Sequence, residues 1–124
     1  MVFNWAKYLV LAEELGTNRM NEAALRSAIS RAYYATFCKA RNRLRQEGIY
    51  IPNTGKAHKI VWDNYREHAD LQRKSIGITG DRLRQSRNKA DYDDEFPNVD
   101  KVVQDSISRA KRLLETLKNL DGEP

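Results

Sequence analysis

The chain is 124 residues long, and 40% of them are hydrophobic while 31% are charged, a balance typical of one soluble globular domain rather than a disordered segment. Its net charge of +5 favours a phosphate-rich partner without requiring one. The single cysteine, Cys38, excludes an intramolecular disulfide and a cysteine-based metal site. No segment approaches the roughly 20 apolar residues that cross a bilayer, and no signal peptide is evident, so we expect a cytoplasmic protein without membrane contact.

Hydrophobic spacing first predicts a helix over residues 2–15, which stops at Gly16. Its predicted inward stripe consists of Phe3, Tyr8, Leu11, Ala12 and Leu15. A longer helix is predicted to begin at an N-cap, Asn21, and to end near Glu47. Its apolar stripe comprises Leu25, Ala28, Ile29, Ala32, Thr36, Ala40 and Leu44. Because alanine lets neighbouring helices approach closely, this helix is expected at the centre of a bundle.

Residues 48–55 are typical of a loop, and helical spacing resumes over residues 56–71. The sequence Ile-Gly-Ile-Thr-Gly at 76–80 predicts a break in the chain. Asp81 can cap a fourth helix that runs to about residue 94.

The last predicted helix covers residues 99–120 and has the most regular pattern in the chain. Its apolar residues recur at steps of four or three: Val99, Val103, Ile107, Ala110, Leu114 and Leu117. Residues 121–124 are expected to fray. With no predicted strand, the fold class is all-α, an up-and-down bundle of four to five helices that forms a single domain over residues 1–120.

The predicted fourth helix carries a compact polar patch, because four of its residues are three or four positions apart and share one face. They are Arg84, Arg87, Asn88 and Asp91, and they border Leu83, Ser86 and Ala90, which are expected to face the core. Two guanidiniums, an amide and a carboxylate can hold a phosphodiester by forked hydrogen bonds. The same residues can equally form an ion-pair network that ties this helix to the second one.

A second polar line follows the long helix with a seven-residue rhythm. It contains Ser27, Arg31, Tyr34, Cys38, Arg41 and Arg45. Arginine interleaved with tyrosine suits RNA, since guanidinium pairs with phosphate and a ring can stack on a base. A solvated basic face, or an oligomer interface anchored by Tyr34, explains the pattern as well.

The two histidines, His58 and His68, are the only candidates for a base of the usual kind near neutral pH. Neither lies in a zinc-binding pattern, and the acidic run that ends the fourth helix is expected to be solvated. Phosphate-binding glycine loops and local nucleophile signatures are absent. The sequence therefore predicts no metal and no cofactor.

Four segments together resemble the HEPN family (higher eukaryotes and prokaryotes nucleotide-binding), in its small stand-alone prokaryotic branch with an Arg-x-x-Ala-Asp-Tyr motif. They are Trp5 with Ala12-Glu13, Glu22-Ala23 leading into Ser30-Arg31-Ala32-Tyr33-Tyr34-Ala35-x-Phe37, Lys56-x-His58, and Arg87-Asn88-Lys89-Ala90-Asp91-Tyr92-Asp93. The second and fourth segments are the specific ones. The resemblance covers most of the chain.

This resemblance implies a helical bundle, frequent homodimers that bring two copies of the fourth-helix motif together, and a place in a toxin–antitoxin or other defence module. For many members it also implies metal-independent endoribonuclease activity, centred on an arginine, a polar residue and a histidine. Arg87 and Asn88 match the first two positions, but Tyr92, Asp93 and Asp94 occupy the positions where histidine is expected. Tyrosine is a poor general base at neutral pH, since its ordinary pKa is near 10.

Three functions follow as hypotheses. The favoured one is a catalytically degenerate module that binds RNA or a nucleotide in a basic dimer cleft, through Arg84, Arg87, Arg31, Tyr34 and Asp91, and that can receive a cognate nucleotidyltransferase-type antitoxin. The second is an active endoribonuclease toxin, in which Arg87 and Asn88 act on the phosphate and Tyr92 or His58 transfers the proton. The third is a structural subunit or partner-binding module whose patch is an ion-pair network.

Overall fold

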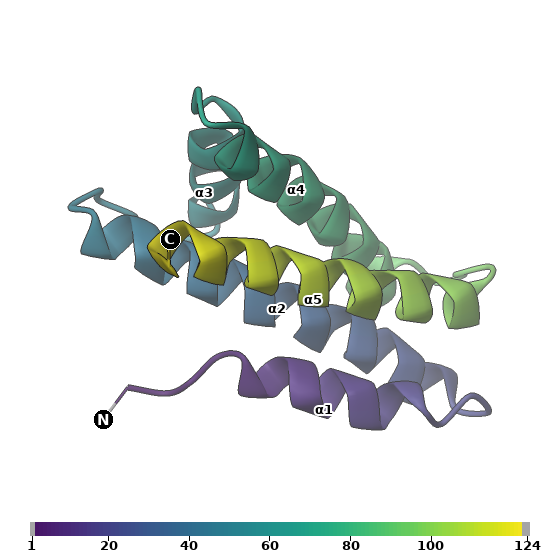
Figure 1. The fold of residues 1–124 in the computed structure, drawn as a ribbon. Helices are drawn as coiled ribbons and strands as arrows, with labels where there is room; N and C mark the ends of the chain where they lie inside the picture. Colours follow the sequence, from purple (N-terminus) through teal and green to yellow (C-terminus); the bar gives the residue numbers. More distant parts are fainter. Residues whose placement is uncertain (1, 123–124) are drawn as a thin grey trace.

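A computed structural model describes residues 2–122 and contains helices but no strand within that range (Figure 1). The helices are α1 (Lys7–Gly16), α2 (Glu22–Gln46), α3 (Ala57–Arg66), α4 (Leu71–Tyr92) and α5 (Val99–Gly122). The all-α bundle predicted from the sequence is therefore confirmed. No helix in this part of the chain is both long and apolar enough to cross a membrane.

The long helix α2 is the centre of the bundle and contacts each of the other four helices. Figure 1 shows α1 and α5 running alongside α2, whereas α3 and α4 form a hairpin that rises from it at an angle. The seven residues of the predicted α2 stripe are all buried, from Leu25 at one end to Leu44 at the other. Asn21 caps the helix as predicted, because its Oδ1 accepts a hydrogen bond from the Ala24 N–H at 3.1 Å.

Helix α1 is shorter than predicted and begins at Lys7 instead of residue 2. The preceding residues form an extended segment and a turn, in which Asn4 Oδ1 accepts a hydrogen bond from the Ala6 N–H at 3.1 Å. Two members of the predicted inward stripe, Phe3 and Leu11, are exposed. The buried face of α1 instead comprises Leu9, Ala12 and Gly16. A helix that packs on α2 through this row turns Leu11 toward solvent.

The predicted break at residues 76–80 is wrong, since α4 runs without interruption from Leu71 to Tyr92. It begins ten residues before the predicted cap at Asp81, and α3 correspondingly ends at Arg66 instead of residue 71. The actual cap is Asp70, whose Oδ2 accepts a hydrogen bond from the Arg73 N–H at 3.0 Å. Asp81 lies inside the helix and forms an ion pair with Arg66 at 3.5 Å.

The two glycines of α4 have a packing role, because α3 lies directly against them. A Cβ atom on Gly77 would come within 2.5 Å of the backbone nitrogen of Arg66. A Cβ atom on Gly80 would come within 2.3 Å of the indole ring of Trp62. Glycine weakens a helix by roughly 1 kcal/mol relative to alanine, but here it permits a close helix–helix contact that any side chain would prevent.

Helix α5 begins at Val99 as predicted and extends to Gly122, two residues beyond the predicted end. The first two residues of the predicted frayed tail are therefore helical, and residues 123–124 lie outside the described residues. Four residues of its predicted stripe are buried: Val103, Ile107, Ala110 and Leu117. The other two, Val99 and Leu114, are partly buried against the same core.

We expect Gly80→Ala to lower the free energy of unfolding by about 1–3 kcal/mol, because the added methyl group overlaps the Trp62 ring and overpacking outweighs the gain in helix propensity. Urea unfolding followed by circular dichroism measures the change. Gly55→Ala is the control, since no atom lies within 4 Å of a Cβ there and no loss is expected. Equal stability of Gly80→Ala and wild type would contradict the packing role.

Candidate functional site

The centre of the predicted polar patch is Arg87 of α4, which is held between two tyrosine rings. Its guanidinium carbon lies 5.0 Å from the ring centroid of Tyr34 on α2 and 5.6 Å from that of Tyr92. Only 14% of the Arg87 side chain is exposed. Contacts between a guanidinium and an aromatic ring are favourable in this distance range and fix the orientation of the cation.

An ion-pair network also surrounds Arg87, as the structural alternative predicted. Arg87 Nε lies 2.8 Å from Asp91 Oδ2, and the Ser30 hydroxyl of α2 donates a hydrogen bond to the same oxygen at 3.3 Å. Arg87 Nη1 donates to Asn88 Oδ1 at 3.0 Å. The buried Nε–H is close to Asp91 but makes no hydrogen bond, because it is not aimed at the carboxylate oxygen. The network thus positions Arg87 while leaving one of its donors unsatisfied.

The end of α4 is fastened to α2 by Arg26, a residue that the sequence did not single out. Arg26 Nη1 donates hydrogen bonds to the carbonyl oxygens of Ala90 at 3.2 Å and Asp93 at 2.5 Å. Carbonyl groups at a helix C-terminus lack helical partners and carry partial negative charge, so a guanidinium stabilises them. This contact fixes the segment that carries Asp91 and Tyr92.

His58 of α3 belongs to the same site, and it is held by a chain of hydrogen bonds. Trp62 Nε1–H donates to the Tyr33 hydroxyl oxygen at 3.1 Å, and that hydroxyl lies 2.5 Å from His58 Nδ1. The Tyr33 hydroxyl accepts from Trp62 and can either donate its own proton to His58 Nδ1 or accept one from it, so both neutral tautomers of His58 fit this contact. In either case the contact fixes the orientation of the imidazole ring.

Aromatic contacts join His58 to the arginines. The His58 ring stacks on Phe37 with centroids 4.2 Å apart and meets the ring of Tyr34 edge-on at 6.0 Å. Tyr34 in turn lies against Arg87. The sequence left open whether α3 packs against α4, and the fold brings the two together. We name this set the arginine–tyrosine cluster; it comprises Tyr34, His58, Arg84, Arg87, Asn88, Asp91 and Tyr92.

The titration of the cluster reflects its burial and its positive charge. Burial, together with the charges of Arg84 and Arg87, lowers the pKa of His58 to about 4, so the ring is neutral at pH 7. Burial also raises the pKa of the Tyr33 and Tyr34 hydroxyls. Arg84 makes no ion pair or hydrogen bond with the side chains of residues 2–120, so no carboxylate among them compensates its charge.

Other predicted residues lie outside the cluster. Arg31 is half-buried, with its guanidinium 4.9 Å from the ring centroid of Tyr8 on α1. Arg41 lies over Trp5 and Phe37, and Arg45 donates to the carbonyl oxygen of Ile51 at 2.8 Å. The polar line of α2 is therefore largely packed and not a solvated basic face.

His68 is exposed at the turn between α3 and α4, where its Nδ1 accepts a hydrogen bond from the Asp70 N–H at 3.0 Å. Ser86, predicted to face the core, is only half-buried. The described residues contain no group of three or more histidine, cysteine or acidic side chains placed to hold a metal ion.

The sequence did not single out Tyr33, Trp62, Ser30 or Phe37 as site residues. One signal was available, because His58 and Trp62 are four residues apart and share a face of α3. Two surface cavities, of about 830 and 390 Å³, lie elsewhere and are not lined by any residue of the cluster.

We expect Arg84→Gln to raise the pKa of His58 from about 4 toward the ordinary 6.5, because one of the two cations that oppose protonation is removed. The shift is measured from the His58 ring proton resonances over a pH titration. Arg82→Gln, an exposed position on α4, is the control and should leave the titration unchanged. An unchanged His58 pKa in Arg84→Gln would contradict the electrostatic link.

The lowered pKa of His58 also determines in which direction the free energy of unfolding changes with pH. Between pH 6.5 and about 4 the unfolded chain binds more protons at His58 than the folded chain does. The stability contributed by neutral His58 is therefore fully present above pH 6.5 and is lost as the pH falls toward 4.

The chain can be compared with known proteins over most of its length. Residues 8–120 match the family model described as the HEPN domain, a range that begins in α1 and extends into the last turns of α5. An uncharacterised protein of Methanocaldococcus jannaschii is 32% identical over 137 aligned positions, which cover 96% of this chain and 77% of that protein. No solved structure gives a significant match. The family match over nearly the whole bundle agrees with the resemblance noted from the sequence, and the chain therefore belongs to the HEPN domain family.

Proposed function

We propose that the arginine–tyrosine cluster binds RNA or a nucleotide through its phosphate groups and that this HEPN domain is catalytically degenerate. The observation that carries the proposal is Arg84, a half-buried guanidinium without a counter-ion among the described residues, beside Arg87, which is already oriented by two rings. Two such guanidiniums provide forked donors for a phosphodiester. Tyr92, which is 72% exposed, offers a ring on which a base can stack.

The electrostatics of His58 support an anionic ligand. The positive field of Arg84 and Arg87 disfavours a proton on the imidazole, and the same field attracts a phosphate. A phosphate bound between the two arginines would compensate their charge. We infer that the cluster is a phosphate-binding surface in which His58 is neutral at pH 7.

Binding is favoured over cleavage because neither candidate base is suited to the task. Tyr92 occupies the position where the active motif has histidine, and a phenol is a poor base at neutral pH. The Nδ1 atom of His58 is engaged by the Tyr33 hydroxyl, and the lowered pKa of about 4 makes the imidazole a weak base. General acid–base catalysis is worth about 10²–10⁴-fold in rate, so its loss weakens cleavage severely.

We also propose an oligomeric state and partners for the domain. We infer a homodimer in which two clusters face each other across a two-fold axis and form one basic cleft. The exposed side chains of Asn88 and Tyr92 at the end of α4 are available to such a partner. A toxin–antitoxin or defence module, with a nucleotidyltransferase-type antitoxin as a further partner, fits the family.

Arg84→Ala should weaken binding of a fluorescently labelled single-stranded RNA oligonucleotide by about 10–100-fold, because a charge-assisted hydrogen bond contributes about 1.5–3 kcal/mol. Fluorescence anisotropy at several salt concentrations measures the affinity. The slope of log affinity against log salt should fall by about 0.7 for each phosphate contact that is lost.

Arg84 is a better test position than Arg87, because Arg87 also forms an ion pair that contributes to the fold. Arg82→Ala removes the same charge from an exposed position on α4 and should change the affinity little. If Arg84→Ala and Arg82→Ala bind RNA equally, the cluster is not the binding surface. If wild-type binding is at background and only Arg87→Ala loses thermal stability, the structural-subunit alternative holds instead.

An active endoribonuclease is the second candidate, and the aromatic contact that brings His58 next to the arginines is the observation that favours it. We expect purified protein to leave RNA intact in EDTA over a period in which an active nuclease gives complete cleavage. Gel electrophoresis of end-labelled RNA measures this. Cleavage in EDTA that is lost in both Arg87→Ala and His58→Gln would overturn the degenerate assignment and identify His58 as the proton-transfer group.

A further inference from the structure

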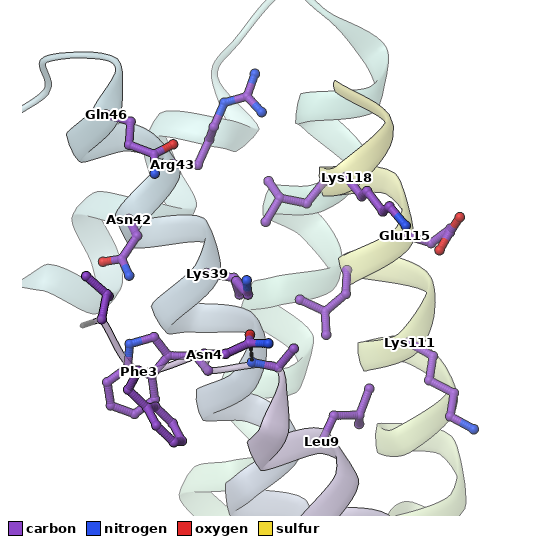
Figure 2. Close-up of a pocket in the computed structure, with 15 residues that line it drawn as sticks. Phe3, Asn4, Leu9, Lys39, Asn42, Arg43, Gln46, Lys111, Glu115 and Lys118 are labelled. Carbon is purple, nitrogen blue, oxygen red and sulfur yellow. Dashed lines mark hydrogen bonds between the residues drawn. The ribbon is translucent and has the colours of Figure 1, made fainter. Parts of the chain in front are cut away.

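A concave surface, separate from the arginine–tyrosine cluster, lies between the N-terminal segment, α2 and α5. Figure 2 shows this groove, flanked by the C-terminal half of α2 and by α5, with the extended residues before α1 at one end. Its volume is about 830 Å³. None of its lining residues comes from α3 or α4, so the groove shares no residue with the arginine–tyrosine cluster.

The floor of the groove is apolar and incompletely covered. Leu9 and Leu117 form its deepest part and are 8% and 7% exposed. At the N-terminal end Phe3 packs edge-on against Trp5 with centroids 4.9 Å apart, yet 49% of Phe3 remains exposed. Val2 beside it is 86% exposed. Adjoining exposed apolar side chains of this kind favour a partner that covers them.

The rim of the groove is strongly basic. Among the described residues, four cations and one carboxylate line it: Lys39, Arg43, Lys111, Lys118 and Glu115. Arg43 pairs with Glu47 at 2.8 Å, and Lys111 pairs with Glu13 at 2.7 Å. Lys39 and Lys118 make no ion pair with the side chains that the structure describes. Figure 2 places Lys39 on α2 and Lys118 on α5, on opposite sides of the apolar floor.

The groove has an apolar floor between two ammonium groups that have no ion-pair partner among the described side chains, and this arrangement defines the chemistry of its occupant. The occupant needs apolar side chains on one face and carboxylates on both edges of that face. An amphipathic helix with apolar residues at i, i+3 or i+4 and i+7, flanked by glutamate or aspartate, has this arrangement. Amide side chains of Asn42 and Gln46 along the α2 edge add hydrogen-bonding groups that suit a peptide better than an acyl chain.

We propose that this groove is a docking site for an acidic, amphipathic segment of a partner protein. The apolar side chains of that segment lie on Leu9, Leu117 and the Phe3 ring, while its carboxylates pair with Lys39 and Lys118. This inference does not rest on RNA binding by the cluster, since the two surfaces share no residues. A nucleic acid is disfavoured as the occupant because phosphates would leave the apolar floor unfilled.

The first experiment identifies the chemistry of the occupant. Phage displaying random 16-residue peptides are selected on the immobilised full chain and counter-selected on the Lys39→Glu/Lys118→Glu variant. The expected sequences carry at least two apolar residues at helical spacing, flanked by acidic residues. Enrichment of basic or neutral sequences, or failure to enrich any sequence, would overturn the proposal.

The second experiment measures binding of one enriched peptide, synthesised with and without its acidic residues replaced by lysine. Trp5 lines the groove whereas Trp62 is 1% exposed, so tryptophan emission reports on the groove, and Trp5→Phe should remove the change. We expect Lys39→Glu/Lys118→Glu to weaken binding at least tenfold, Lys39→Gln/Lys118→Gln to weaken it less, and the lysine-substituted peptide not to bind.

Matched controls separate this site from general charge effects and from the cluster. Lys101→Glu/Arg112→Glu makes the same charge change at exposed positions of α5 outside the groove, and it should bind the peptide as wild type does. Lys39→Glu/Lys118→Glu should retain RNA binding that depends on Arg84. If this variant instead loses RNA affinity and binds the peptide normally, the groove is part of an RNA surface and the docking proposal is wrong.

Discussion

The candidate site depends on the contact between Trp62 of α3 and the glycine face of α4. The indole ring of Trp62 occupies the space that a side chain on Gly80 would fill, and only 1% of the residue is exposed. Its Nε1–H binds the Tyr33 hydroxyl, which in turn positions His58. The helix packing that brings α3 against α4 therefore also sets the orientation of the imidazole, so a change in the packing contact would displace the site as well.

The sequence predicted best those elements whose apolar pattern is complete within one helix. The seven residues of the predicted α2 stripe are all buried and Asn21 is the N-cap, because both predictions depend only on helical spacing and on one local side-chain hydrogen bond. The stripe left out five further residues of α2 that are also buried: Ser30, Tyr33, Ala35, Phe37 and Cys38. The continuity of α4 was missed because Gly77 and Gly80 have low intrinsic helix propensity. The close packing of α3 against these glycines offsets their low propensity. A contact between two helices cannot be read from the pattern of residues within one helix.

The same distinction applies to the site. The grouping of Arg84, Arg87, Asn88 and Asp91 follows from spacing on a single helix and required no knowledge of the fold. The connection from His58 through Tyr34 to Arg87 crosses three helices, so it could not be derived from spacing. Arg31 makes a contact that its place in the α2 rhythm did not predict, because Tyr8 of α1 lies against its guanidinium. Its RNA contact stays a prediction.

Helix α2 supplies residues to both proposed surfaces, the arginine–tyrosine cluster and the groove. A substitution that tests one surface alone must therefore avoid the α2 residues that contact both. Phe37 stacks on His58 of the cluster, while Arg41 lies 5.9 Å from the Phe37 ring and 5.8 Å from the ring of Trp5 in the groove. A substitution at Phe37 or Arg41 would disturb both surfaces at once. Arg84 and Lys118 lie on α4 and α5, outside this shared row, so their effects on RNA and peptide binding can be assigned to one surface each.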